Sequence, residues 1–523
     1  MAPAVLSFWR CLFWVSDFIS YVLLVTSNSL TRLWKIGHRD VNPDSRYSND
    51  QTPLSLAASG GREGVVRLLL ERRDVNSDWR DSNDQTPLSL AALGGHERVV
   101  KLLLYEEVSS SSSDSYGGMP YPFSAPEGHD VVRLARRRQD INPDSRDSNG
   151  QTPLSIAASR GHEGVVRLLL EHRDVNSDSR DSNGQTPLSL AASGGHEGVV
   201  RLLLEYEDVN PSSSNNDSQT PLSLAASGGH EGVVWLFLEY WDANPDSHVS
   251  NSQTLLSLAA SSGHESVVRL LVRGGYINPN SQNSNGQTPL SLAASRGHEG
   301  VVELLLEHED VNLNSLDNDG QTPLSLAASG GHEGVVRLLL SRQDVKPDSR
   351  DSNGQTPLSL ATSRGHEGVV KLLIEREDIN PSSSDFDSQT PLSLAASGGH
   401  DGVVRLLLEH WSSNPDFPDS NVQTLLSLAA SRGHEGVVRL LLRHGYINLD
   451  LQDSNGQTPL SLAAFRGHEG VVRLLLKRRD VNPDSWDSNG QTPLSLAASR
   501  GHEGVVRLLL ERRYVNSDSR DSN

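Results

Sequence analysis

The sequence predicts an all-α solenoid, and three observations support this prediction. The string Gln-Thr-Pro-Leu recurs at intervals of 34 residues along most of the chain, beginning for example at Gln151, Gln185 and Gln321. Two short apolar patterns with helical spacing follow each copy. Residues 151–320 and 321–490 also match each other as two blocks of 170 residues. A fixed period of this size is typical of a repeat array whose repeats stack in a row.

The first part of each repeat predicts a turn followed by a short helix. In one copy, Asp181-Ser182-Asn183-Gly184 favours a tight turn, because Asn and Gly tolerate positive φ. Thr186 is placed to cap a helix, and Pro187 suits its first turn, where a missing N–H has no cost. The apolar residues among 188–192 share one helical face, and the small alanines allow a second helix to approach closely.

The second part predicts a turn and a second helix. Gly194-Gly195 is expected to end the first helix, because Gly adopts the left-handed cap most readily. The second helix is expected from about His196, with its apolar face among residues 199–204. Glu197 and Arg201 are spaced for an exposed ion pair worth about 0.2–0.5 kcal/mol. Each repeat is therefore helix, turn, helix and protruding loop, and it buries its apolar face only by stacking.

These motifs resemble the ankyrin repeat. The matching features are Thr-Pro-Leu, the following Ala-Ala, Gly-His, Val-Val-x-Leu-Leu-Leu and Asp-Val-Asn, over roughly residues 38–523. The resemblance implies an ankyrin solenoid of about fourteen units that binds proteins. The near-identical copies look like the long arrays of filamentous fungi, where such arrays often form the sensor arm of larger NLR-like proteins. Three departures stand out: Ser189 replaces the usual His, Gly198 replaces a bulkier residue, and the longer loop makes the period 34 rather than 33.

Residues 1–48 differ from the repeats. Residues 12–25 are apolar apart from Ser16, Asp17 and Ser20, but the run is short for a membrane span and Asp17 lies at its centre. The end of the segment, around His38, matches the tail of a repeat. We expect a diverged N-terminal cap. A membrane anchor and a gene-model artefact are the alternatives.

The remaining chain divides into three parts. Residues 49–117 and 151–523 are expected to be regular repeats, the latter as the two blocks plus a final repeat. Residues 118–150 are expected to be a degenerate repeat, because Pro122 and Pro126 fall inside its first helix and an interior proline costs about 3 kcal/mol. The final repeat keeps an internal type of apolar face, so we expect it to fray or to stack against another molecule.

Charge and cysteine content restrict the class of partner. The chain has 66 acidic and 46 basic residues, a formal net charge of −20, which argues against nucleic acid as a ligand. The single cysteine, Cys11, allows no intrachain disulfide and fits a reducing compartment. We therefore expect a monomeric cytoplasmic protein. Membrane association through residues 12–25 is the alternative.

The motifs favour no catalytic chemistry. His196-Glu197-Gly198-Val199-Val200 begins like the zinc-protease motif, but Val200 stands where the second histidine is needed. The histidines therefore read as turn residues. No phosphate-binding Gly-x-x-x-x-Gly-Lys-Ser/Thr string occurs. Paired carboxylates recur in nearly every loop, which favours solvated turns over a catalytic pair. The sequence predicts no enzyme, no metal and no cofactor.

The expected function is a non-catalytic scaffold or adaptor that binds proteins on the concave surface of loops and first helices. Aromatic residues are scarce but gather near the end of the second helix, and Trp and Tyr are favoured interface anchors. An alternative is that these aromatics pack around the altered turn at Leu255. The candidate partner-binding residues are Trp241, Tyr276, Trp411, Tyr446, Ser189, Ser193, Arg160 and Arg296. Repeated identical surfaces also suit a repetitive ligand and avidity.

Overall fold

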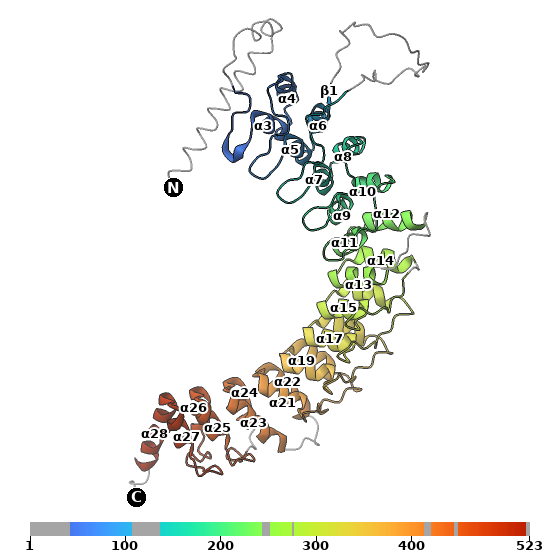
Figure 1. Ribbon diagram of the computed structural model, residues 1–523. Helices are drawn as coiled ribbons and strands as arrows, with labels where there is room; N and C mark the ends of the chain where they lie inside the picture. The colour runs from blue at the N-terminus through green and yellow to red at the C-terminus, as the bar shows by residue number, and fades with distance from the viewer. Residues whose placement is uncertain are drawn as a thin grey trace, which may run out of the picture. The chain divides into compact units, whose positions relative to one another are not determined.

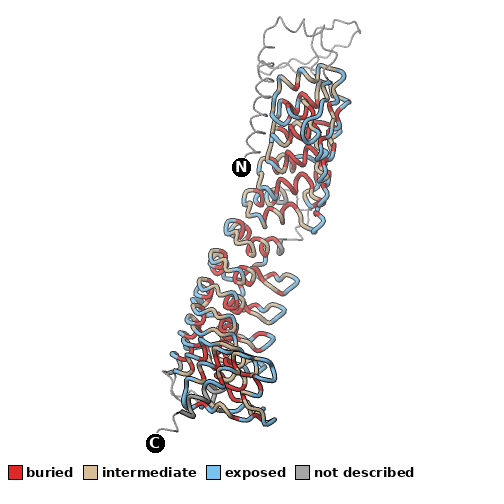
Figure 2. Tube along the Cα trace, turned by 90° about the vertical axis from the view of Figure 1, so that its left-hand side faces the viewer, coloured by how far each residue is buried: buried red, intermediate tan, exposed pale blue. Residues whose placement is uncertain are grey.

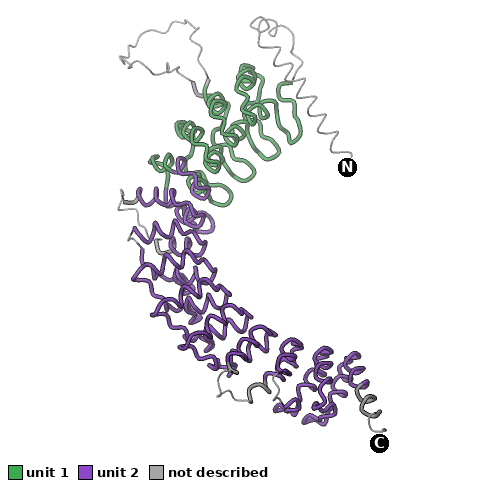
Figure 3. Tube along the Cα trace, turned by 180° about the vertical axis from the view of Figure 1, so that it is seen from behind, with its two compact units in different colours: residues 1–191, 201–210 green, residues 192–200, 211–523 purple. Residues whose placement is uncertain are grey.

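The computed structural model describes residues 42–106, 136–242, 252–274, 277–412, 420–443 and 448–518. The chain separates into two compact units (Figure 3). Compact unit 1 comprises residues 1–191 and 201–210, and compact unit 2 comprises residues 192–200 and 211–523. The apolar segment 12–25 lies outside the described residues.

Both compact units are built from pairs of short antiparallel helices (Figure 1). The first helices are α3 (Pro53–Ser59), α5 (Pro87–Leu93), α7 (Pro153–Arg160), α9 (Pro187–Ser193), α11 (Pro221–Gly228), α13 (Ser252–Ser262), α15 (Pro289–Arg296), α17 (Pro323–Gly330), α19 (Pro357–Arg364), α21 (Pro391–Gly398), α23 (Ser420–Arg432), α25 (Pro459–Arg466) and α27 (Pro493–Arg500). The second helices are α4 (Glu63–Leu70), α6 (Glu97–Leu104), α8 (Glu163–Leu170), α10 (Glu197–Leu204), α12 (Glu231–Asp242), α14 (Glu265–Arg273), α16 (Glu299–Leu306), α18 (Glu333–Leu340), α20 (Glu367–Ile374), α22 (Asp401–Ser412), α24 (Glu435–Leu441), α26 (Glu469–Leu476) and α28 (Glu503–Asp518). A short 3-10 helix, η1 (Ser48–Asp50), precedes α3.

The predicted caps determine where the first helices begin and end. In α19, Thr356 has an extended backbone, and its side chain accepts a hydrogen bond from the Ser359 N–H. Pro357 follows as the first helical residue, where it loses no hydrogen bond. Gly365 ends the helix with φ +79°, a left-handed conformation that residues with a β-carbon rarely adopt.

The core lies between the two helices of each repeat and between neighbouring repeats (Figure 2). In α18, Val335, Val336 and Leu339 are fully buried. In compact unit 2, each first helix from α11 to α27 packs against the next first helix, and each second helix from α12 to α28 packs against the next second helix. The same order holds for α3, α5 and α7 in compact unit 1. The predicted all-α solenoid of stacked helix pairs is confirmed.

Two first helices begin early, and the cause is a single substitution. The repeats at Leu255 and Leu425 have leucine where the others have proline. Helix α13 starts at Ser252 and α23 at Ser420, upstream of these leucines. Proline disfavours helical backbone at the residue before it and lacks an N–H, so its loss lets the helix extend toward the loop.

The repeat that begins at Gln85 stacks directly on the repeat that begins at Gln151. Helix α5 packs against α7 and α6 against α8, although the intervening chain is longer than elsewhere. Two short antiparallel strands, β1 (Tyr105–Glu106) and β2 (Arg136–Arg137), pair where this extra chain leaves and rejoins the stack. The prolines expected to break a helix, Pro122 and Pro126, lie outside the described residues. The degenerate repeat over 118–150 therefore stays a prediction.

Candidate protein-binding surface

The histidine of each Gly-His turn joins neighbouring repeats. His366 Nε2 lies 3.0 Å from the Ser329 main-chain oxygen of the preceding repeat. A carbonyl only accepts, so Nε2 carries the proton and donates. The ring lies against Gly331, where a β-carbon would overlap it. The same bond to a preceding repeat is made by His96, His230, His264, His298, His332, His400, His434, His468 and His502.

The turn histidines thus act as structural links. The sequence placed them in the turn but did not show their contact with the preceding repeat. Among the residues that the structure describes, no three His, Cys, Asp or Glu side chains gather as metal ligands.

The glutamate that begins a second helix reaches the next repeat. The Glu299 carboxylate lies against Gly334, where a β-carbon would overlap it. Gly334 is the second residue of α18, so the negative charge lies at the positive end of that helix dipole. This contact explains why glycine follows the glutamate in most repeats: a side chain there would displace the carboxylate of the preceding repeat.

The ion pair expected between Glu197 and Arg201 is wrong. Glu197 lies against Gly232 of the next repeat, and the structure forms no ion pair between Glu197 and Arg201. The predicted spacing does produce a pair at Glu63 and Arg67, 3.3 Å apart. There the next repeat has Arg98 in place of the glycine, 3.5 Å from the other oxygen of Glu63.

The two candidate serines have different positions. Ser189 is fully buried, its hydroxyl 3.1 Å from the Thr186 hydroxyl, and its N–H donates to that same oxygen. Ser189 therefore stabilises the helix start and presents no side chain to a partner in this structure. Ser193 is exposed, and its main-chain oxygen accepts a hydrogen bond from His230 Nε2 at 2.9 Å.

The candidate arginines are exposed at the ends of first helices. Arg160 is the last residue of α7 and Arg296 the last of α15. Arg296 Nη1 donates to the Ser261 main-chain oxygen at 3.2 Å, and His298 donates to the same oxygen at 3.0 Å. Arg296 therefore reaches back across the boundary between two repeats and leaves part of its guanidinium exposed.

The candidate aromatic residues are not placed by the structure. Trp241 belongs to α12 and Trp411 to α22, but their side chains lie outside the described residues, as do Tyr276 and Tyr446 entirely. An aromatic partner site at these residues stays a prediction. Nearby, Trp235 is 46% exposed on α12, whereas Phe237 is fully buried and belongs to the core.

The loops use their acidic residues to hold turns. Asp181 Oδ1 accepts hydrogen bonds from the N–H groups of Asn183 and Gln185, at 2.9 and 2.8 Å. Adjacent loops are joined by main-chain bonds, such as Ser352 N–H to Asp319 O at 2.9 Å. The repeated loop carboxylates are therefore structural acceptors, as their repetition predicted.

Some exposed apolar side chains were missed as candidates. Leu316, Phe386 and Trp486 are 51%, 72% and 67% exposed in three loops of compact unit 2. Each occupies a loop position that is polar in most repeats. Phe465 is a similar departure at the end of α25, where other repeats have serine. Comparison of each repeat with the consensus would have identified all of them.

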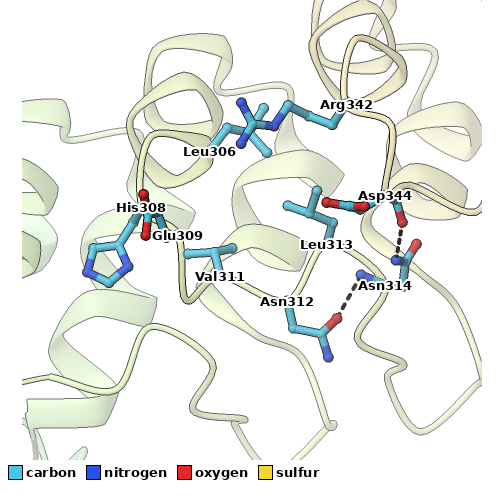
Figure 4. Close-up of a pocket in the computed structure, with 9 residues that line it drawn as sticks. All are labelled: Leu306, His308, Glu309, Val311, Asn312, Leu313, Asn314, Arg342 and Asp344. Carbon is cyan, nitrogen blue, oxygen red and sulfur yellow. Dashed lines mark hydrogen bonds between the residues drawn. The ribbon is translucent and has the colours of Figure 1, made fainter.

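A polar cavity of about 190 Å³ lies between two loops of compact unit 2 (Figure 4). Its wall includes Asn314, whose Nδ2 donates to the Asp344 main-chain oxygen at 2.7 Å, and Asn312, whose Oδ1 accepts from the Asn314 N–H. These polar groups are used in loop-to-loop hydrogen bonds. The cavity is thus a crevice of the stack, with its side chains engaged in holding adjacent loops together.

None of the described helices has the length and apolar character needed to cross a membrane. Comparison with curated proteins found no match. Models of ankyrin repeats match residues 23–114, 123–215, 207–283, 275–351, 343–419, 412–485 and 462–510. These matches cover most of the chain and coincide with the stacked helix pairs. The chain belongs to the ankyrin-repeat family and is built from protein-interaction repeats.

Proposed function

We propose that this chain is a non-catalytic scaffold or adaptor that binds proteins on the surface formed by its loops and first helices. The observation that supports this proposal is the use made of the reactive side chains. The histidines of the Gly-His turns bond to the preceding repeat, the loop aspartates hold turns, and the Thr-Pro-Leu-Ser hydroxyls cap helices. The exposed arginines and loop tips then remain for a partner.

Selection of peptides on the purified full chain tests this function. A displayed library of random peptides should yield binders that protect amides in the loops and first helices from hydrogen exchange. Failure to obtain any peptide with a dissociation constant below about 100 µM, roughly −5.5 kcal/mol, would contradict a peptide-binding scaffold.

Two further proposals follow from the sequence. A cytoplasmic monomer is expected from the single cysteine and the acidic charge, and light scattering at high concentration tests the monomer. A membrane-tethered adaptor would require residues 12–25 to insert, and fractionation of a reporter fused to residues 1–40 distinguishes the two locations. A role as the sensor arm of a larger NLR-like protein is the other alternative, and a nucleotide-binding domain encoded upstream of Met1 would support it.

A further inference from the structure

Three successive first helices of compact unit 2 end in arginine. Arg432, Arg466 and Arg500 are the last residues of α23, α25 and α27, and all three are exposed. Helix α23 packs against α25, and α25 against α27, so the three arginines form a row along one edge of the stack. At the other first-helix ends, arginine does not occur in three consecutive repeats. We call Arg432, Phe465, Arg466 and Arg500 the arginine row.

An aromatic ring lies within the row. The Arg500 guanidinium lies over the Phe465 ring, 4.2 Å from its centroid. The ring is partly exposed, and the Phe465 main-chain oxygen accepts the hydrogen bond from His502 Nε2 at 3.1 Å. The backbone of Phe465 is therefore fixed, and its ring offers a small apolar surface next to a cation.

Two cations of the row have no partner within the described part of the chain. Neither Arg432 nor Arg466 forms a hydrogen bond or an ion pair there. In contrast, Arg296 and Arg364 donate to main-chain oxygens of the preceding repeat, at 3.2 and 3.1 Å. The row thus presents unused guanidinium groups, which favour carboxylates because of their forked geometry.

The two 170-residue blocks show that folding does not require this row. The positions of Arg432, Phe465 and Arg500 correspond to Ser262, Ser295 and Gly330 in the first block. That block forms the same helices, α13, α15 and α17, without the three side chains. The substitutions therefore add chemistry to a surface whose packing is already complete.

From these observations we propose that the arginine row binds an extended acidic peptide. Successive first helices pack about 8–10 Å apart, and an extended chain advances about 3.3 Å per residue, so every third residue meets the next arginine. The peptide would present a carboxylate at every third position and an aliphatic or aromatic side chain between the last two, against Phe465. This inference rests on the proposed scaffold function and names the partner chemistry.

Charge separates this ligand from nucleic acid. The whole chain carries a formal charge of −20, so a polyanion meets a favourable potential only locally. Glu435, Glu469 and Glu503 begin the second helices a few residues beyond the three arginines, and they flank the row with negative charge. A peptide with spaced carboxylates can contact the row alone, whereas nucleic acid carries continuous charge and needs a broader basic surface.

Fluorescence anisotropy with the full chain tests the proposal. The probe is a labelled peptide with glutamate at every third position and leucine between the last two. The controls are the same peptide with glutamine for glutamate, and a peptide with the same composition but adjacent glutamates. The spaced acidic peptide should bind at least about tenfold more tightly than either control, and high salt should weaken binding because it screens exposed charges.

The deciding variant carries Arg432→Ser, Phe465→Ser and Arg500→Gly, the residues that the first block already tolerates. It should keep the wild-type melting temperature and bind the acidic peptide at least about tenfold more weakly. The matched control Arg296→Ala, in the first block, should leave binding unchanged. The reciprocal variant Ser262→Arg, Ser295→Phe and Gly330→Arg should add a second peptide site.

Several results would overturn the arginine row. These are unchanged binding in the triple variant, equal binding of the glutamine peptide, or equal binding of an oligothymidylate with the same charge. Selected peptides that bind but do not protect residues 432–466 in hydrogen exchange would also overturn it, while leaving the scaffold function intact. Absence of any peptide binder would contradict the scaffold function itself.

Discussion

Loop aspartates and asparagines at one position form a natural comparison. Asn314 Oδ1 accepts from the Lys346 N–H at 2.8 Å, and its Nδ2 donates to the Asp344 main-chain oxygen at 2.7 Å. At the equivalent position, Asp144 Oδ2 accepts from the Asn176 N–H at 2.8 Å, but Oδ1 is buried without a hydrogen bond. Asp78, Asp178 and Asp348 share this defect. Burial raises the pKa of the Asp144 carboxyl, although the Asn176 N–H and Arg146 oppose the rise.

Asp144→Asn should therefore stabilise the fold, because the new amide can donate to the main-chain oxygen of Asp174. We expect a gain of about 0.5–1.5 kcal/mol in the free energy of unfolding at pH 7. Urea denaturation measures the gain, and Asp44→Asn is the control, since the Asp44 carboxylate oxygens both lie within reach of the Asn76 N–H.

The same substitution predicts a pH dependence. A carboxyl whose pKa is raised by folding favours the folded state at low pH, and that contribution is lost as pH rises through the folded pKa. The advantage of Asp144→Asn should thus shrink as pH falls from 7 toward the unfolded value of about 4, because protonated Asp144 can also donate. An advantage that grows on acidification would contradict this explanation.

The contact between Glu299 and Gly334 gives a second prediction for single residues. Alanine favours a helix over glycine by up to about 1 kcal/mol, but a methyl group at Gly334 displaces the Glu299 carboxylate from the start of α18. Losing that charge from the helix end costs about 0.3–1 kcal/mol. Gly334→Ala should therefore stabilise less than Gly436→Ala, where the shorter Asp401 leaves 3.1 Å to the β-carbon position.

Chemical denaturation compares the two glycine variants. Adding Glu299→Gln to Gly334→Ala should remove most of the difference, because the displaced charge is then absent from both states. Equal effects of Gly334→Ala and Gly436→Ala would show that the carboxylate does not stabilise α18.

At the scale of helices, the sequence predicted the starts and ends well because local chemistry decides them. Thr356, Pro357 and Gly365 hold α19 with the caps that their residue types predict. The candidate site was predicted less well. Ser189 was expected at the surface but is buried, because its hydroxyl bonds to Thr186. Contacts between repeats, such as His366 with Ser329, depend on stacking and leave no mark in the spacing within one repeat.

Leu255→Pro tests the rule for helix starts. Proline should move the start of α13 from Ser252 to residue 255 and return Thr254 to an extended cap, as at Thr288. Amide exchange at residues 252–254 should become faster, while the buried Ala259 remains protected. Leu425→Pro should act in the same way on α23. Unchanged protection at residues 252–254 would show that the surrounding stack, not the missing proline, extends α13.

At the scale of the whole chain, the period predicted a continuous array but could not show which repeats are neighbours. Arg80 Nη1 donates to the Arg146 main-chain oxygen, 66 residues further along, where the regular interval between such partners is 34. His162 Nε2 likewise contacts the Leu93 main-chain oxygen at 3.1 Å. The loop, turn and helix contacts of a normal boundary therefore join the repeats at Gln85 and Gln151.

Removal of residues 107–135 should consequently leave the stack intact. Glu106 pairs with Arg136 across β1 and β2, so an Asn-Gly linker between them can close a two-residue hairpin. The shortened chain should unfold within about 3 °C of the full chain, because the packing of α5 on α7 and of α6 on α8 is retained. Circular dichroism on heating measures this.

The alternative makes the opposite forecast. If residues 118–150 formed a repeat that supports its neighbours, the deletion would remove packed apolar surface, lower the melting temperature and expose Leu102 and Leu103, which are now buried. Hydrogen exchange across α6 separates the two outcomes. Slow exchange of α6 in both proteins means that the repeats at Gln85 and Gln151 are true neighbours, whereas fast exchange in the shortened chain alone means that the removed segment was part of the stack.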